Sequence, residues 1–180
     1  MNSAPANLMI LVGEHFACVK ITGRANFKVS VDFKTLLTEL HQRGFTCFVI
    51  ELSECSLMDS TFLGVLAGFG LKMFQAADRS PSNLVELRNP NARITELLEN
   101  LGVLHLFSIS QGPLAASETV QESSPEPAHA SRTEITRACL EAHRTLMEIN
   151  PANVSRFKEV TKFLAEDLHK LGDQPQAVDK

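Results

Sequence analysis

Apolar and polar positions along the first 110 residues follow two periods, and each period predicts its own type of element. Short apolar runs bounded by turn residues are typical of strands. They predict strands at residues 7–12, 16–22, 47–52, 83–87 and 105–109. The run at 47–52 is continuously apolar, which indicates a central strand that is covered on at least one face.

Apolar residues that recur every three or four positions predict helices between these strands. The first helix spans 29–43 and the second spans 60–77, where it follows a loop. The third begins with Asn89 as its cap and Pro90 at the first helical position, and Gly102 ends it. Strands and helices that alternate in this way predict an α/β fold.

The pattern changes after residue 110. Residues 111–131 contain three prolines, four serines and three glutamates, with no Lys or Arg and no apolar period, so we expect a flexible linker. Two amphipathic stripes follow within 132–172 and are broken at 150–153, which predicts a helical hairpin. The sequence therefore divides into a domain at 1–110, the linker, the hairpin and a disordered tail at 173–180.

The hairpin cannot be stable by itself. Short amphipathic helices in water depend on packing of their apolar stripes. Three partners remain open for the hairpin: its own two helices, the domain at 1–110, or a second copy of the chain as a homodimer.

The charge balance excludes some classes of partner. The net charge is −4, with nine basic and ten acidic residues in 1–110 and eight and eleven in 111–180, so neither part offers a basic surface to nucleic acid. No apolar run reaches the roughly 20 residues that span a bilayer, so we expect no membrane insertion. The first residues lack the basic start of a signal peptide, which predicts a cytoplasmic protein.

Cysteines, histidines and glycines show no pattern of a metal or cofactor site. There is no CxxC pair and no histidine cluster at metal-ligand spacing, and the nine glycines form no phosphate-binding loop. Cys18 and Cys47 lie in strand-like apolar runs, so we interpret them as buried thiols. We therefore expect no disulfide, metal or cofactor.

The segment SLMDSTFLGVLAGFG at residues 56–70 carries the candidate chemistry. Asp59 and Ser60 precede the second helix, where a side-chain oxygen can accept hydrogen bonds from backbone N–H groups that lack helical acceptors. This helix has one charged residue, Lys72, and apolar residues on all sides. That composition indicates either burial on several sides or an exposed docking surface. Small residues such as Gly64 and Gly68 would let other backbones approach closely.

An enzymatic role for Ser60 lacks support in the sequence. No GxSxG nucleophile motif is present, and none of the six histidines has a pattern that pairs it with this serine. We therefore do not expect an enzyme.

The residues of this segment resemble a known family. The strand, the loop Leu57-Met58-Asp59-Ser60 and the helix that contains Leu63-Gly64 are similar to STAS domains of the anti-sigma factor antagonist type. The later segment NPNARITELLENLGVLHLF and the strand end VKITGRA match the same family in the same order. The resemblance covers about residues 5–110 and implies a mixed β-sheet with helices packed against it, to which this chain adds its C-terminal helical hairpin.

The resemblance also implies a switch. In the family, the serine at the position of Ser60 is phosphorylated by a serine kinase that is also the anti-sigma factor. The unphosphorylated antagonist binds this kinase and frees the sigma factor, phosphorylation ends the binding, and a phosphatase restores it. We expect the partner to contact Asp59, Ser60, Thr61, Phe62, Leu63 and Leu66, and Asp59 to help orient the Ser60 hydroxyl.

Two residues depart from the family pattern. Phe62 stands where phosphorylated members usually have Gly, and Arg24 follows Gly23 where they often have Glu. A Phe beside the acceptor could shield Ser60 or form part of a permanent contact surface. The second alternative is a STAS scaffold that is not phosphorylated, as in a stress-signalling assembly or as the soluble subunit of a lipid transporter.

Overall fold

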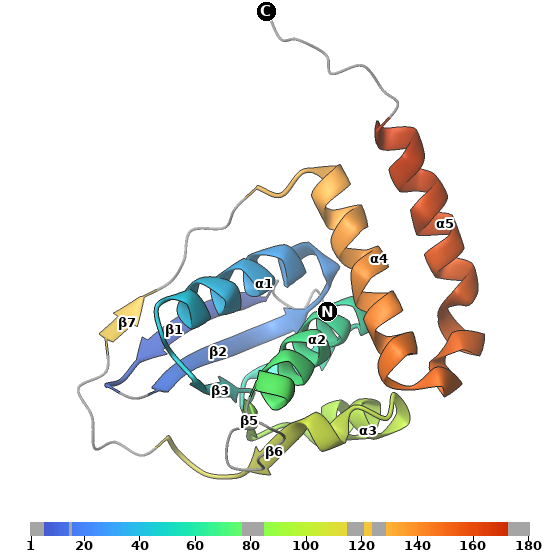
Figure 1. The fold of residues 1–180 in the computed structure, drawn as a ribbon. Helices are drawn as coiled ribbons and strands as arrows, with labels where there is room; N and C mark the ends of the chain where they lie inside the picture. The colour runs from blue at the N-terminus through green and yellow to red at the C-terminus, as the bar shows by residue number, and fades with distance from the viewer. Residues whose placement is uncertain (1–5, 15, 77–84, 115–120, 124–128, 173–180) are drawn as a thin grey trace, which may run out of the picture.

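A mixed β-sheet forms the centre of the molecule, and two helices pack against one of its faces (Figure 1). The computed structural model describes residues 6–14, 16–76, 85–114, 121–123 and 129–172. Within these ranges, no helix combines the length and apolar character that a membrane crossing requires.

The sheet has the strand order β6-β5-β3-β2-β1-β7. Its main strands are β1 (Asn7–Val12), β2 (Phe16–Ala25), β3 (Cys47–Glu51), β5 (Val85–Arg88) and β6 (Phe107–Ser110). β1 and β2 form an antiparallel hairpin, whereas β2, β3, β5 and β6 are all parallel. Parallel neighbours need long connections, and the predicted helices supply them. The structure therefore confirms the predicted α/β fold with its mixed sheet.

Two short strands were not predicted from the sequence. β4 (Cys55–Met58) pairs in parallel with the end of β2, in a segment that we expected to be a loop. β7 (Gln121–Ser123) pairs antiparallel with β1 inside the expected linker. Both strands are too short to show an apolar period, and they form because the backbone groups of a neighbouring strand are available for pairing.

The first helices begin and end close to their predicted positions. α1 (Phe27–Gln42) has Asn26 as its N-cap, and Gly44 follows it with a φ of +97°. α2 (Ser60–Ala76) begins at the predicted serine. The predicted start and end residues of these helices are therefore confirmed to within two residues.

The start of α3 (Ala92–Asn100) requires a correction. Its N-cap is Asn91, whose side chain accepts from the backbone N–H of Ile94, so Asn89 is not the cap and Pro90 precedes the helix. Asn89 instead has a φ of +54° and donates to both carboxylate oxygens of Glu51. The two asparagines have similar local sequence signals, and contacts with distant residues distinguish them: Asn89 bonds Glu51 and Gly112, whereas Asn91 donates to the carbonyl of Cys55. Gly102 ends the helix as predicted, with a φ of +69°.

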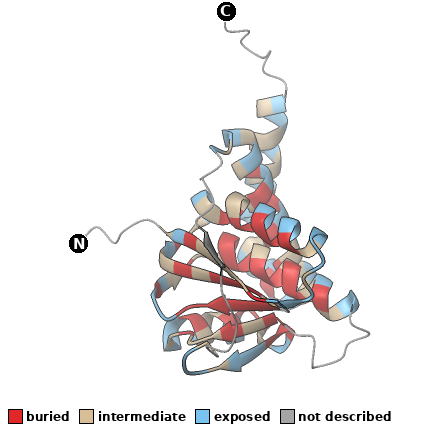
Figure 2. Ribbon diagram, turned by 90° about the vertical axis from the view of Figure 1, so that its left-hand side faces the viewer, coloured by how far each residue is buried: buried red, intermediate tan, exposed pale blue. Residues whose placement is uncertain are grey.

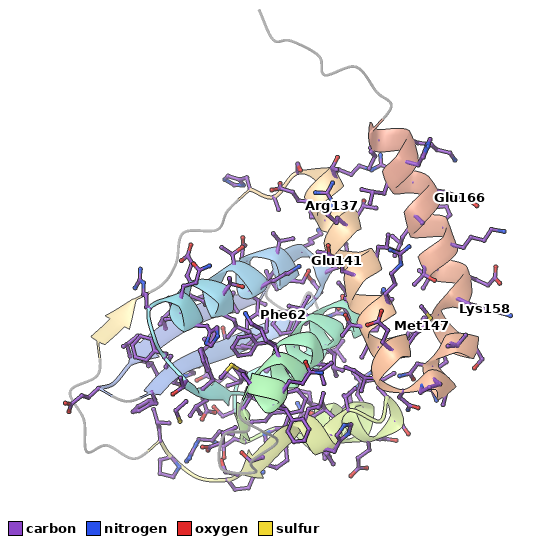
Figure 3. All side chains as sticks on the ribbon, in the orientation of Figure 1. Phe62, Arg137, Glu141, Met147, Lys158 and Glu166 are labelled. Atoms are coloured by element: carbon purple, nitrogen blue, oxygen red, sulfur yellow. The ribbon has the colours of Figure 1, made fainter. Side chains whose placement is uncertain are left out.

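The core lies between the sheet and the helices that cover it, as the band of buried residues in Figure 2 shows. Phe62 is fully buried there and stacks on Phe33 of α1, with 4.4 Å between the ring centroids. In Figure 3 its ring lies between α1 and α2. Phe62 is therefore a core residue that joins the two helices.

The C-terminal hairpin packs on the domain as well as on itself. It consists of α4 (Arg132–Ile149), the short turn η3 (Pro151–Asn153) and α5 (Val154–Gly172). A capping box of Ser131 and Glu134 starts α4. α4 contacts α2 and α1, and α5 lies on the outer side of α4 (Figure 1). The residues predicted to form a disordered tail lie outside the described part of the chain.

The closest approach between α4 and α2 is at Gly64. A Cβ atom on Gly64 would lie 2.6 Å from the carbonyl oxygen of Ala142 and 2.8 Å from its Cβ. At Gly68, one turn later, a Cβ would lie 3.4 Å from Thr145 Cγ2, which is an ordinary contact. The side chain of a residue at 64 would therefore push α4 away from α2, whereas a methyl group at 68 fits.

We predict opposite results for the two glycines. Gly64→Ala should lower the free energy of unfolding by about 1–3 kcal/mol, because the overlap with Ala142 exceeds the gain in helix propensity. Gly68→Ala should leave it unchanged or raise it by up to about 1 kcal/mol. Urea unfolding of the full chain measures both. Equal effects of the two substitutions would contradict the close packing of α4 on Gly64.

Candidate functional site

Asp59 connects the beginnings of α1 and α2. Its Oδ1 accepts from the backbone N–H of Phe62 and its Oδ2 from that of Phe27, both at 2.8 Å. Its own N–H donates to the carbonyl of Ala25 at 3.0 Å, so the end of β2 fixes the position of the residue. One carboxylate therefore caps α2 and satisfies an N–H group in the first turn of α1, at the end of each helix where negative charge is stabilising.

Ser60 is the first residue of α2, and its hydroxyl points to the C-terminal hairpin. The hydroxyl oxygen lies 3.0 Å from Nε2 of His143 on α4. Nδ1 of the same ring lies 2.7 Å from the carbonyl oxygen of Cys139. A carbonyl oxygen only accepts, so Nδ1 carries a hydrogen, and in the neutral ring Nε2 accepts from the Ser60 hydroxyl. The ring also packs against Phe157 of α5, with 4.8 Å between the centroids.

This pairing corrects two expectations. We expected no histidine to pair with Ser60, and we expected Asp59 to orient the serine hydroxyl. The hydroxyl is bonded to His143 instead, while both Asp59 oxygens accept from backbone N–H groups. The two paired residues are 83 positions apart, so no local pattern links them. The available signal was the position of His143 on the apolar stripe of α4, next to Ala142.

The residues expected to contact a partner separate into two groups. Asp59 and Ser60 are partly exposed, whereas Thr61 is only 5% exposed, because it faces α4 and donates to the sulfur of Cys139 at 3.7 Å. Phe62, Leu63 and Leu66 are fully buried in the core. In this conformation they are therefore not an exposed docking surface, because the apolar side of α2 packs on the sheet and α1.

α4 thus covers the side of α2 that carries the serine. His143 is only 6% exposed and Ala142 only 2%. This arrangement holds the Ser60 hydroxyl as a hydrogen-bond donor to His143. The hydroxyl oxygen lies at the N-terminus of α2, which is the positive end of the helix dipole. An anion on this oxygen would gain from the helix dipole, and it would have to replace the contact with His143.

The cysteines are thiols with reduced acidity. Burial raises the pKa of Cys18 to about 12, and nearby Glu51 adds to the effect. Burial also raises the pKa of Cys139, against the opposing hydrogen bond from Thr61. Cys47, which we expected to be buried, is exposed at the start of β3.

Within the described residues, no three His, Cys, Asp or Glu side chains are grouped so that they could hold a metal ion.

The double role of Asp59 leads to a prediction. Asp59→Ala should lower the free energy of unfolding by about 2–4 kcal/mol, because two N–H groups lose a charged acceptor. Asp59→Asn should fall between this variant and wild type, since one amide oxygen serves only one N–H well. Glu96→Ala, at an exposed position in α3, should stay within about 0.5 kcal/mol of wild type in the same urea unfolding experiment. An Asp59→Ala variant as stable as Glu96→Ala would contradict the bridging role.

Comparisons with known proteins match this chain through its structure. No family model and no curated protein sequence matches it. An anti-sigma factor antagonist from Mycobacterium paratuberculosis is similar, with a TM-score of 0.50 at 14% identity over 63% of this chain and 92% of that one. The anti-sigma factor antagonist SpoIIAA in its unphosphorylated form gives 0.45 at 14% identity, over 60% of this chain and 89% of that one. Phosphorylated SpoIIAA from Bacillus gives 0.45 at 15%, over 57% and 89%. The chain has the STAS fold of these anti-sigma factor antagonists.

Proposed function

We propose that this chain is a regulatory binding protein of the anti-sigma factor antagonist type. It binds an anti-sigma factor that is also a serine kinase, and this kinase phosphorylates Ser60. A phosphatase removes the phosphate and restores binding. The partner contacts the surface around Asp59, Ser60 and Thr61, and Phe62, Leu63 and Leu66 hold the helix that presents it.

One observation carries the proposal, which is the position of Ser60. It is the first residue of α2, directly after Asp59, in a domain with the STAS fold. Its side chain is partly exposed. A similar protein, SpoIIAA, exists in a phosphorylated and an unphosphorylated form. In this chain the resemblance of the segment at 56–70 to the antagonist family makes Ser60 the candidate for this modification.

The physical basis of the switch is electrostatic. A phosphate adds about −1.5 to −2 charge, which the N-terminus of α2 stabilises, so the domain does not need to unfold. A partner that packs on the same surface would have to desolvate the dianion, and the removal of water would strengthen the repulsion between the phosphate and Asp59. A loss of about 1.4 kcal/mol already reduces affinity tenfold.

A second function is favoured by a different observation. The Ser60 hydroxyl is engaged by His143 and lies beside α4, which limits the access of a kinase. This supports a scaffold that binds its partner permanently and is never phosphorylated, in a stress-signalling assembly or with a lipid transporter. The two functions differ in whether phosphate is ever found on Ser60.

We predict one phosphate on Ser60 in protein isolated from its own cells. Intact mass should show a species about 80 Da heavier than the unmodified chain, as a phosphoryl group requires, and peptide fragmentation should place it on Ser60. Ser60→Ala should lose this species, and Thr61→Ala should keep it. Its absence across growth and stress conditions would favour the permanent scaffold. Equal phosphate on Ser60→Ala would place the modification elsewhere.

We also propose that the hairpin forms a homodimer through the outer side of α5. Phe163 is 65% exposed there, and Val160 lies one turn earlier at 36%. Large apolar side chains that are exposed in one stripe are typical of an interface, and Phe163 and Val160 form such a stripe. Lys158 on the same helix (Figure 3) is five positions before Phe163, which places it about 140° away around the helix and outside this stripe.

Substitution of Phe163 tests the dimer. Phe163→Asp should raise the dimer dissociation constant by about 10- to 100-fold, because burial of a Phe side chain contributes about 1.5–3 kcal/mol. Lys158→Asp, which also adds an acidic residue to exposed α5, is the control and should change it much less. Sedimentation of the full-length variants over a range of concentrations measures both. A wild-type chain that is monomeric at all concentrations would refute this proposal.

A further inference from the structure

α4 occupies the side of α2 that the proposed function assigns to the partner. The contacts between α2 and α4 begin at Ser60 and continue along both helices. They are Ser60–His143, Thr61–Cys139, Gly64–Ala142 and Gly68–Thr145. Residues at 60, 64 and 68 share one side of a helix, so α4 follows this side for more than two turns. We call this side of α2, together with the adjoining side of α1, the α4 groove.

The main apolar cluster of the domain takes few of its members from α4. In the main apolar cluster of the described residues, every buried member but one comes from residues 8–107. The exception is Leu146, near the end of α4. The other contacts of α4 in the groove come from small or polar side chains, such as Ala142 and His143. Departure of α4 would therefore remove one large side chain, Leu146, from this cluster and uncover the sides of α2 and α1 that α4 contacts, while the pairing of the strands does not involve α4.

The groove is also incompletely filled. A cavity of about 230 Å³ remains between α1, α2 and α4. Leu37, Val65 and Phe69 line its apolar wall, and Lys34 and Lys72 lie at its edge. Lys34 forms an ion pair with Glu141 of α4 at 2.5 Å, in which both side chains are about half exposed. Glu141 lies on the side of α4 that faces α1 (Figure 3). Exposed pairs of this kind contribute little stability, about 0–1 kcal/mol.

We propose that α4 is an intramolecular ligand of the α4 groove, which is the binding surface for a helix of the partner. This inference rests on the proposed function, because it makes α4 and the partner compete for the side of α2 that carries Ser60. When α4 leaves, the groove accepts a helix in its place. The Ser60 hydroxyl becomes available to the partner at the same step.

The groove defines the chemistry of the helix that it accepts. Opposite Gly64 the helix needs a small residue, as Ala142 is, because the backbones approach too closely for a larger one. Beside it an acidic residue matches Lys34 and Lys72, as Glu141 does in α4. Directly after the small residue, an acceptor such as the ring of His143 can take the Ser60 hydrogen. The partner helix therefore has an acidic residue next to a small one.

A substitution in α4 can displace α4 from the groove without changing any residue of α1 or α2. Ala142→Leu places a larger side chain against the backbone at Gly64 and should displace α4, whereas Arg144→Leu adds the same side chain at an exposed position. Alkylation of Cys139, now partly covered by α2, reports whether α4 has left. We expect its rate to rise about tenfold or more in Ala142→Leu and to stay near wild type in Arg144→Leu.

The binding probe is a synthetic, fluorescein-labelled peptide with the sequence of residues 131–149. It should bind full-length Ala142→Leu about tenfold or more tightly than wild type or Arg144→Leu, because its own α4 no longer competes. The same peptide with Ala142→Leu should not bind. Faster alkylation of Cys139 without binding of the peptide would overturn the proposal, and so would an unchanged rate together with no binding.

A covalent lock tests the same point if Ala142→Leu does not fold. The oxygen of Thr61 lies 3.7 Å from the sulfur of Cys139, so Thr61→Cys can form a disulfide that holds α4 in the groove. In a chain that also carries Cys47→Ser, the peptide is used at up to about millimolar concentration, where it can compete with the tethered α4. It should then bind the reduced form and lose about tenfold or more in affinity on oxidation. Equal affinities of the two forms would refute the competition. Neither experiment uses a kinase or phosphate, so their failure is distinct from an absence of phosphate on Ser60.

Discussion

The carboxylate of Asp59 is the contact on which the arrangement of the site depends. It joins the first turns of α1 and α2 to each other, and the end of β2 holds it in place. Two helices that begin at one acceptor must lie side by side, and Phe33 and Phe62 then stack between them. The position of Ser60 follows from the same contact, because the residue after a helix cap is the first residue of the helix. Stability and the presentation of the serine therefore come from one side chain.

The contact between Ser60 and His143 gives the C-terminal hairpin a role that composition alone did not indicate. A hairpin that is separated from a domain by a polar segment has the appearance of an appendage. Here its first helix lies on the proposed binding side of α2 and bonds the candidate phosphate acceptor. The same segment that makes a partner compete for the groove also holds the hydroxyl in a defined orientation. In the proposed function, partner access and phosphorylation of Ser60 would then depend on one event, the departure of α4.

Local patterns were sufficient for most of the fold. The period of the apolar residues located the main strands and α1, and the short polar segment before α2 identified Asp59 and Ser60 as its start. The choice between Asn89 and Asn91 as a cap was wrong because both have the same local signal, and contacts with distant residues decide between them. β7 and the Ser60–His143 bond escaped prediction for a related reason. Each depends on which parts of the chain meet in space, and a single sequence does not contain that information.

In the proposed competition, the short strand β7 shortens the segment of chain that links α4 to the sheet. By pairing with β1, it fixes the chain to the sheet only eight positions before the cap of α4 at Ser131, instead of at the end of β6. A short tether gives its attached helix an effective concentration on the order of millimolar at the groove. A partner helix present at about micromolar concentration would then need to bind about a thousandfold more tightly than a free α4 helix to displace it. Three residues at the edge of the sheet therefore set a threshold of affinity below which other helices are excluded.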